Sequence, residues 1–148
     1  MKIKLTLSIV LIGCISATAI AADHKAVVVH RQGIYKVMAG HMDALKSILI
    51  LKHPKLIDVQ YHADSILNAA KHHGNAFPKG SGKGKTQALP TIWEKPKDFK
   101  SAGIKLRNAL NDFTQLTDKS DMKVLQAAFK KVGSACKSCH DDFRKKID

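Results

Sequence analysis

Aromatic residues are scarce in this sequence, since Phe, Trp and Tyr together make up 5% of its 148 residues. Its β-branched residues form no long alternation with polar ones, the pattern that half-buried strands require. Both absences argue against a β-sandwich or a β-barrel. Apolar residues make up 45% of the chain, which argues against a disordered protein. Lys, Ala and Leu are plentiful, so the composition favours an all-α fold around one compact core.

Acidic residues are also few. The chain has 12 Asp and Glu against 25 Lys and Arg, and its formal net charge is +13. The basic residues are spread along the whole chain, and no array of aromatic side chains is available for stacking bases. We therefore expect no nucleic-acid partner. The charge fits either an acidic protein partner or a solvated surface.

The N-terminus has the three parts of an export signal. Lys2 and Lys4 precede an apolar run over residues 5–15, and Ala19-Ile20-Ala21 offers a small-residue cleavage site. We predict a signal peptide over residues 1–21, followed by one domain over residues 22–148. The mature protein is then located in the bacterial periplasm.

A second interpretation of the leader stays open. Leu11-Ile12-Gly13-Cys14 resembles a lipoprotein box, which would leave Cys14 as a lipidated N-terminus. In either case the chain crosses the inner membrane, and no later segment is long and apolar enough to span it. Loss of Lys2 and Lys4 with the leader leaves a net charge of +11.

The spacing of apolar residues predicts four helices in the mature chain. They cover residues 25–52, 54–73, 96–116 and 121 to near the C-terminus, with Val37 and Val124 among the residues expected on inner faces. Short turns join the helices within each pair, and a long connection over residues 74–95 joins the two pairs. This is the pattern of an antiparallel up-down-up-down four-helix bundle.

Finer features follow from the residues between the helices. Ser120 is a candidate N-cap of the fourth helix, and residues 91–94 are expected to form a short turn with a capping box. The residues 79–85 are rich in Gly and Lys but match no phosphate-binding loop. We expect them to form a mobile tip at the surface.

Two cysteines lie in the predicted mature chain, three residues apart in Cys136-Lys137-Ser138-Cys139-His140. This C-x-x-C-H pattern is the attachment signal of a c-type haem. Each thiol adds to one vinyl group, and one helical turn brings both cysteines to the same edge of the porphyrin. The adjacent His140 then donates an axial nitrogen to the iron. One motif predicts one covalently bound haem c.

Three other interpretations of the cysteines were weighed. A thioredoxin-like redox pair requires a βαβ context. A zinc site requires a fourth ligand beyond Cys136, Cys139 and His140. A structural disulfide between Cys136 and Cys139 is the third. The spacing and the adjacent His140 favour the haem over all three.

The haem motif lies eight residues from the C-terminus, on the last of the four predicted helices. In this the chain resembles the cytochrome c′ family, the class II c-type cytochromes, over residues 28–147. The resemblance is carried by Arg31-Gln32, by Pro90-Thr91-Ile92-Trp93 and by the very specific block over residues 132–146. It implies a four-helix bundle with the haem inside.

The resemblance implies that His140 is the only protein ligand and that the iron is five-coordinate and high-spin. The opposite face of the haem would be covered by Tyr35, at the position where low-spin relatives carry a ligating Met. A phenol keeps its proton near pH 7, which argues against ligation by Tyr35.

The resemblance assigns four further residues to the cofactor. Arg31 and Gln32 are expected to contact the haem propionates. Trp93 would pack near the haem edge, or only cap the core. Arg144 lies one turn beyond His140 on the same helix face. It would influence small ligands beside His140, or else pair with a neighbouring carboxylate at the surface.

The helical periodicity leaves a rival open. Met38 and Met42 share the stripe of Tyr35, so either could approach the iron and make a low-spin, six-coordinate electron carrier. His41 would be another second ligand. The remaining histidines are expected at the surface: His24, His30, His53, His62, His72 and His73.

The resemblance implies two activities. A five-coordinate iron in an apolar pocket would bind small neutral gases, nitric oxide and carbon monoxide. The same haem would carry electrons to a redox partner, for which the positive charge favours an acidic protein. We see no distal acid–base pair for a peroxidase, so we expect no enzyme. Members of the family often form homodimers through the first two helices, which makes a second copy a candidate partner.

Overall fold

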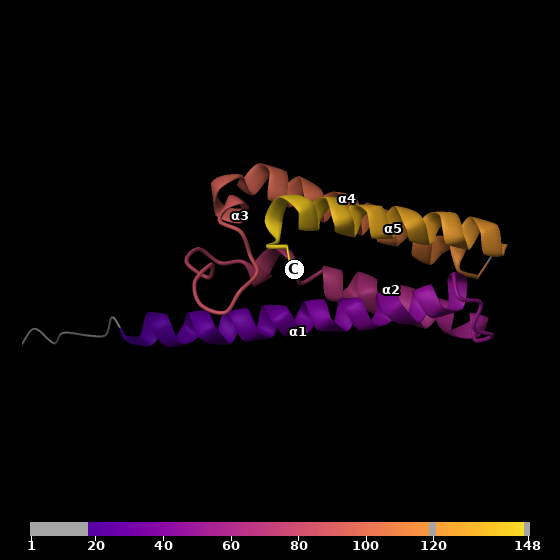
Figure 1. The fold of residues 1–148 in the computed structure, drawn as a ribbon, viewed down its shortest axis with the longest axis horizontal. Helices are drawn as coiled ribbons and strands as arrows, with labels where there is room; N and C mark the ends of the chain where they lie inside the picture. Colours follow the sequence, from indigo (N-terminus) through magenta and orange to yellow (C-terminus); the bar gives the residue numbers. More distant parts are fainter. Residues whose placement is uncertain (1–17, 119–120, 147–148) are drawn as a thin grey trace, which may run out of the picture.

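The computed structural model describes residues 18–118 and 121–146. In these ranges the chain is helical and contains no β-strand. The long helices form two antiparallel pairs, with α1 beside α2 in one layer and α4 beside α5 in the other (Figure 1). The helices are α1 (Thr18–Leu49), α2 (Val59–Ala70), α3 (Thr91–Glu94), α4 (Pro96–Leu116) and α5 (Met122–Phe143). The predicted four-helix bundle is confirmed.

The turn between α1 and α2 differs from the prediction. We expected the first helix to end at Lys52, but it ends at Leu49, and Lys52 adopts a left-handed backbone conformation with φ of 62°. The second helix was expected from residue 54, but residues 56–58 form a 3-10 turn in which Ile57 is 87% exposed. Burial of the apolar face starts only at Val59, and the α-helix begins there because packing stabilises it.

The α4–α5 pair follows the prediction closely. Pro96 occupies the first turn of α4, where its missing N–H costs no hydrogen bond, and the helix ends at Leu116 as expected. Ser120, the expected N-cap of α5, lies outside the described residues. Asp121 holds that position, and its carboxylate accepts a hydrogen bond from the Val124 N–H at 2.9 Å.

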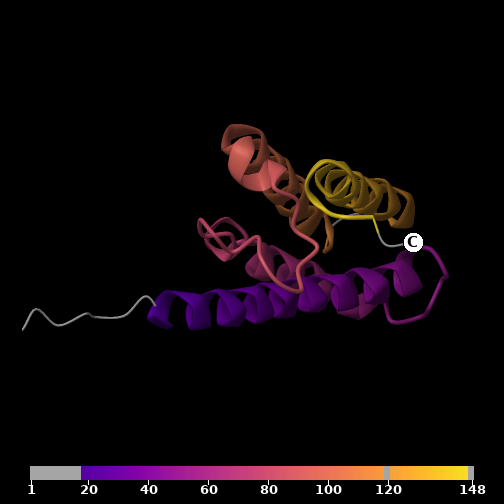
Figure 2. The same cartoon turned by 60° about the vertical axis from the view of Figure 1, so that its left-hand side comes forward.

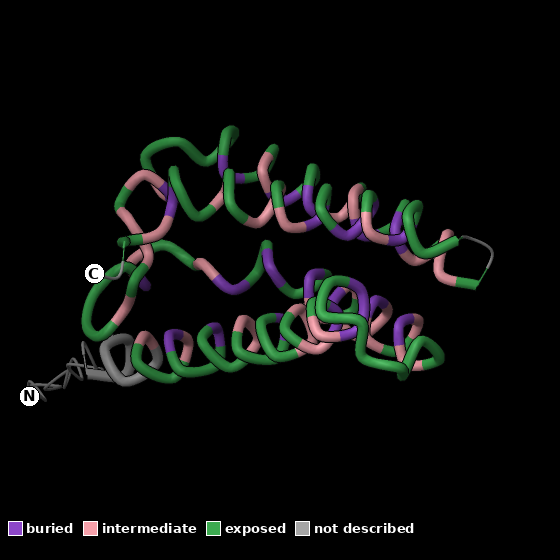
Figure 3. The backbone as a smooth tube through the Cα atoms, turned by 45° about the vertical axis from the view of Figure 1, so that its right-hand side comes forward, coloured by how far each residue is buried: buried purple, intermediate pink, exposed green. Residues whose placement is uncertain are grey.

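The core lies between the two layers, where buried stretches of the long helices face one another (Figure 3). Burying one large apolar side chain fully contributes about 1.5–3 kcal/mol. The largest fully buried side chains include Leu45, Leu49, Ile66, Leu110, Phe113 and Leu125. Val37 and Val124 were wrongly placed on inner faces, since they are 51% and 41% exposed. Each follows the helical spacing only approximately and falls on the flank of its helix.

The long connection between α2 and α4 lies at one end of the bundle, between α1 and the other layer (Figure 2). It contains a 3-10 turn over Gly74–Ala76 and the short helix α3. The predicted turn at residues 91–94 is therefore confirmed, but the capping box is wrong. Thr91 lies inside α3, and its hydroxyl donates to the Asp142 carbonyl oxygen at 2.9 Å.

No helix in the described ranges is long and apolar enough to cross a membrane. Residues 1–17 of the predicted signal peptide, with Cys14 among them, lie outside those ranges. The leader and the domain boundary at Ala22 therefore stay predictions.

Candidate functional site

Cys136 and Cys139 lie on the inner side of α5, where three-residue spacing places them one turn apart. Both thiols are free and partly buried. Cys136 packs against the main core, and Cys139 packs against a smaller cluster made by Ile92, Phe99 and Phe143. Burial raises the pKa of both thiols, that of Cys139 to about 11, so both stay protonated at neutral pH.

These surroundings favour the haem over the alternatives. No βαβ unit surrounds the cysteines, and their sulfurs are not joined in a disulfide. In the part of the chain that the structure describes, no three His, Cys, Asp or Glu side chains are grouped closely enough to hold a metal ion. Two free thiols directed inward, followed by an imidazole, fit the covalent attachment of one haem.

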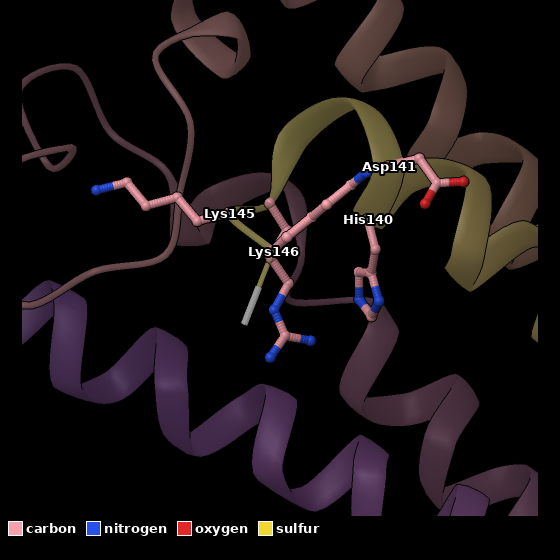
Figure 4. A pocket seen from close by; sticks show the side chains of 5 residues that line it. His140, Asp141, Lys145 and Lys146 are labelled. Carbon is pink, nitrogen blue, oxygen red and sulfur yellow. The ribbon is translucent and has the colours of Figure 1, made fainter. Parts of the chain in front are cut away.

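His140 follows Cys139 on α5 but points to a different side of the helix. His140 is exposed, and its ring lines an open surface pocket of about 240 Å³ with Asp141, Arg144, Lys145 and Lys146 (Figure 4). Partial burial and the positive charge of Arg144 lower the pKa of His140, although Asp141 opposes the shift. This shift favours the neutral imidazole, which has a lone pair available for a metal.

Arg144 lines the same pocket as His140, but it does not share a helix face with it as predicted, because α5 ends at Phe143 and Arg144 is extended. Its Nε donates to Oε1 of Gln87 at 2.8 Å. The alternative pairing with a neighbouring carboxylate is therefore not the contact that forms. Residues 87–89 run beside the end of α5, since the Leu89 N–H donates to the Phe143 carbonyl oxygen and the Lys145 N–H to that of Gln87.

Arg31 is almost completely buried, with 3% of its surface exposed. Its Nη1 donates to the Ala76 carbonyl oxygen at 3.2 Å and to Ser81 Oγ at 3.0 Å. Its Nη2 donates to the Ser81 carbonyl oxygen at 2.9 Å and to Thr86 Oγ1 at 2.8 Å. The guanidinium also lies 4.5 Å from the centre of the Phe77 ring. Arg31 thus donates all four of its Nη protons to the long connection. Contact between Arg31 and a haem propionate stays a prediction.

The surface position predicted for residues 79–85 is confirmed for most of them, and their mobility stays a prediction. Ser81 is completely buried beneath Arg31. Gly82 lies against the indole of Trp93, where a Cβ atom would approach a ring carbon to 2.7 Å. Lys79 and residues 82–85 are exposed, as the composition indicated, while Arg31 and Trp93 contact the segment at Ser81 and Gly82.

Gln32 and Trp93 also hold the long connection. Gln32 Nε2 donates to the Lys85 carbonyl oxygen at 2.8 Å. Trp93 Nε1 is 3.2 Å from the carbonyl oxygens of both Phe77 and Pro78. The indole packs against the same cluster as Cys139, which is compatible with both predicted roles, haem contact and core packing.

His73 was predicted at the surface, and this prediction is wrong. It is 6% exposed, and its Nδ1 is hydrogen-bonded to the Tyr35 hydroxyl. The sequence held a signal for this. Ile66, Ala70 and His73 follow one another at intervals of four and three residues, so His73 continues the inner face of α2 beyond the helix end.

The candidate second ligands have other contacts. Met38 is buried in the main core, and Met42 packs against it. His41 Nδ1 lies 2.8 Å from His62 Nδ1 on the neighbouring helix.

Comparison with known proteins places this arrangement in a family. The model of the cytochrome c′ family matches residues 26–144. A cytochrome c′ from Pararhodospirillum photometricum is 31% identical over 83% of this chain and 99% of its own length. A cytochrome c-556 from Agrobacterium fabrum is 34% identical over 99% of this chain and 98% of its own.

A solved structure has the same fold. It is a nitric oxide complex of a variant of cytochrome c prime from Alcaligenes xylosoxidans, with a TM-score of 0.77 and 26% identity. The match covers 84% of this chain and 97% of that one. The chain therefore belongs to the cytochrome c′ family, whose members carry covalently bound haem c.

Proposed function

We propose that the protein is an exported, mono-haem cytochrome of the periplasm that binds nitric oxide and carbon monoxide and transfers electrons. Cys136 and Cys139 hold the haem covalently, and His140 is the only protein ligand of its iron. The observation that carries this proposal is the division of α5, which directs two thiols toward the core clusters and an imidazole toward an open pocket at the surface.

Tyr35 supports a five-coordinate iron. Burial and the nearby thiols of Cys139 and Cys136 raise the pKa of its phenol above the ordinary value, although Arg31 opposes the shift. Because a protonated phenol is a poor ligand, Tyr35 covers the open face without occupying it. Met38 is packed into the core as an apolar side chain, the commoner role of a buried Met.

The bound haem supplies an iron that changes oxidation state and accepts a diatomic ligand. The protein holds and shields it. Arg31 and Gln32 hold the long connection, and Trp93 packs against the same cluster as Cys139. The proposed activity is binding and electron transfer, without catalytic turnover. Its electron-transfer partner is an acidic protein, attracted by the excess of basic residues.

A visible spectrum of the purified holoprotein tests the proposal. We expect ferric and ferrous spectra of the high-spin type, with a shift when carbon monoxide or nitric oxide is added. A low-spin spectrum with a sulfur-to-iron charge-transfer band would contradict it. Loss of that band in Met38→Leu or Met42→Leu would then identify the ligand and favour a six-coordinate electron carrier. Haem that stays on the denatured polypeptide tests the covalent attachment separately.

A further inference from the structure

Tyr35 and His73 form a hydrogen-bonded pair among aromatic side chains. The Tyr35 hydroxyl is bonded to His73 Nδ1, and both rings pack edge-on against Phe77. Phe99 lies 4.8 Å from the His73 ring, measured between centroids, and also packs edge-on against Phe143. Two polar side chains in such a setting are costly unless their hydrogen bonds are satisfied.

One hydrogen-bonding atom of the pair has no partner. His73 Nε2 is buried and makes no hydrogen bond. It faces α4 at Gly103, where a Cβ atom would lie 3.2 Å from it. If Tyr35 donates to Nδ1, the Nε2 proton is left against Gly103 without an acceptor. If Nδ1 carries the proton and donates, the phenol proton becomes free to leave the pair.

The protonation state of the pair leaves one proton available for donation to a third group. Burial and the charge of Arg107 lower the pKa of His73 to about 4. Burial and the nearby thiols raise that of Tyr35. Arg31 is the other charged group that faces the phenol. At neutral pH both side chains are therefore uncharged and share two protons, of which their mutual hydrogen bond uses one.

The pair also lies on the cofactor side of α1. The thiols of Cys139 and Cys136 are near enough to affect the ionisation of Tyr35. The cluster containing Phe99, on which His73 stacks, includes Cys139. Polar groups at this place determine which small ligands a haem pocket prefers.

We propose that the Tyr35 hydroxyl donates a hydrogen bond to the ligand in the haem pocket and that His73 positions this hydroxyl. The pocket then favours nitric oxide, which accepts a hydrogen bond, over carbon monoxide, which accepts one poorly. Tyr35 is a ligand-contacting residue, and His73 is a positioning residue that acts through it. This inference rests on the proposed function, because it requires an open face on the iron.

The test uses the ferrous holoprotein and the C–O stretching frequency of its carbon monoxide complex. A hydrogen bond to the ligand lowers this frequency, so Tyr35→Phe is expected to raise it. The same variant is expected to lower the ratio of nitric oxide to carbon monoxide affinity about two- to tenfold, the effect of one hydrogen bond. The wild-type frequency is also expected to shift in deuterated water, which needs no variant.

Variants at position 73 separate positioning from packing. His73→Leu is expected to reproduce part of the Tyr35→Phe shift, and His73→Asn, which keeps a donor near the Nδ1 position, to restore the wild-type frequency. In the Tyr35→Phe background, His73→Leu should add nothing. His72→Leu changes the exposed neighbouring histidine and is the matched control.

The outcomes are distinguishable. Carbon monoxide that binds with a frequency unchanged by Tyr35→Phe and by deuterated water would overturn the inference and leave the proposed function standing. A wild-type iron that already has two protein ligands would overturn both.

Discussion

Replacing Arg31 by Ala tests what this side chain does. The structure gives it four hydrogen bonds to the long connection and a contact with the Phe77 ring, all in a buried setting. A hydrogen bond to a charged group contributes about 1.5–3 kcal/mol, but the buried guanidinium offsets much of that sum by losing its hydration. We therefore expect Arg31→Ala to lower the free energy of unfolding by about 3 kcal/mol.

The loss of stability in Arg31→Ala should originate in the segment that Arg31 holds. Hydrogen exchange of the backbone amides over residues 76–86 should become faster in Arg31→Ala, and a protease should cleave there first. Chemical denaturation measures the total loss. Gln32→Ala is the matched control, because it removes one exposed hydrogen bond to the same segment and should cost less than about 1 kcal/mol. If Arg31→Ala costs no more than this control, or exchange over residues 76–86 is unchanged, Arg31 does not anchor the segment.

Three further predictions concern His73, Gly82 and Lys52. The folded protein holds the His73 proton less tightly than the unfolded chain does. The free energy of unfolding should therefore fall by about 3 kcal/mol as the pH is lowered from about 6.5 to 4. His73→Asn should remove most of this pH dependence, measured by urea unfolding at each pH. Gly82→Ala should destabilise the fold by about 1–3 kcal/mol and lower the melting temperature, because the new methyl group meets Trp93. Its control is Gly40→Ala, which adds a methyl group in open space on α1 and should raise the melting temperature. Lys52→Gly should raise the unfolding free energy by about 0.5–1 kcal/mol, since glycine adopts a positive φ without strain, and an unchanged midpoint would contradict this account of the turn.

Sequence reasoning succeeded where local rules decide the structure. Pro96 and the apolar spacing after it were sufficient to place α4 from end to end. The C-x-x-C-H motif identified the cofactor because helical geometry alone brings Cys136 and Cys139 to one side of α5. Both features depend only on residues close together in the chain.

Prediction from the sequence failed where the hydrogen-bond partner of a residue lies far away in the chain. The Gly- and Lys-rich residues 79–85 are mostly exposed, as their composition indicates, but Ser81 among them is buried against Arg31, fifty residues away. His73 was assigned to the surface with the other histidines, although its spacing from Ile66 and Ala70 continues the inner face of α2, and its hydrogen-bond partner on α1 is not visible in the local sequence. The contact between Arg144 and Gln87 is likewise invisible in the local sequence.

The long connection touches both layers of the bundle. Arg31 of α1 binds it at residues 76–86, and residues 87–89 then run beside the end of α5, next to Arg144. It is thus a mechanical link between the helix that carries Tyr35 and the pocket of His140. In the proposed site, this segment therefore connects the surroundings of Tyr35, on one face of the cofactor, with those of His140 on the other.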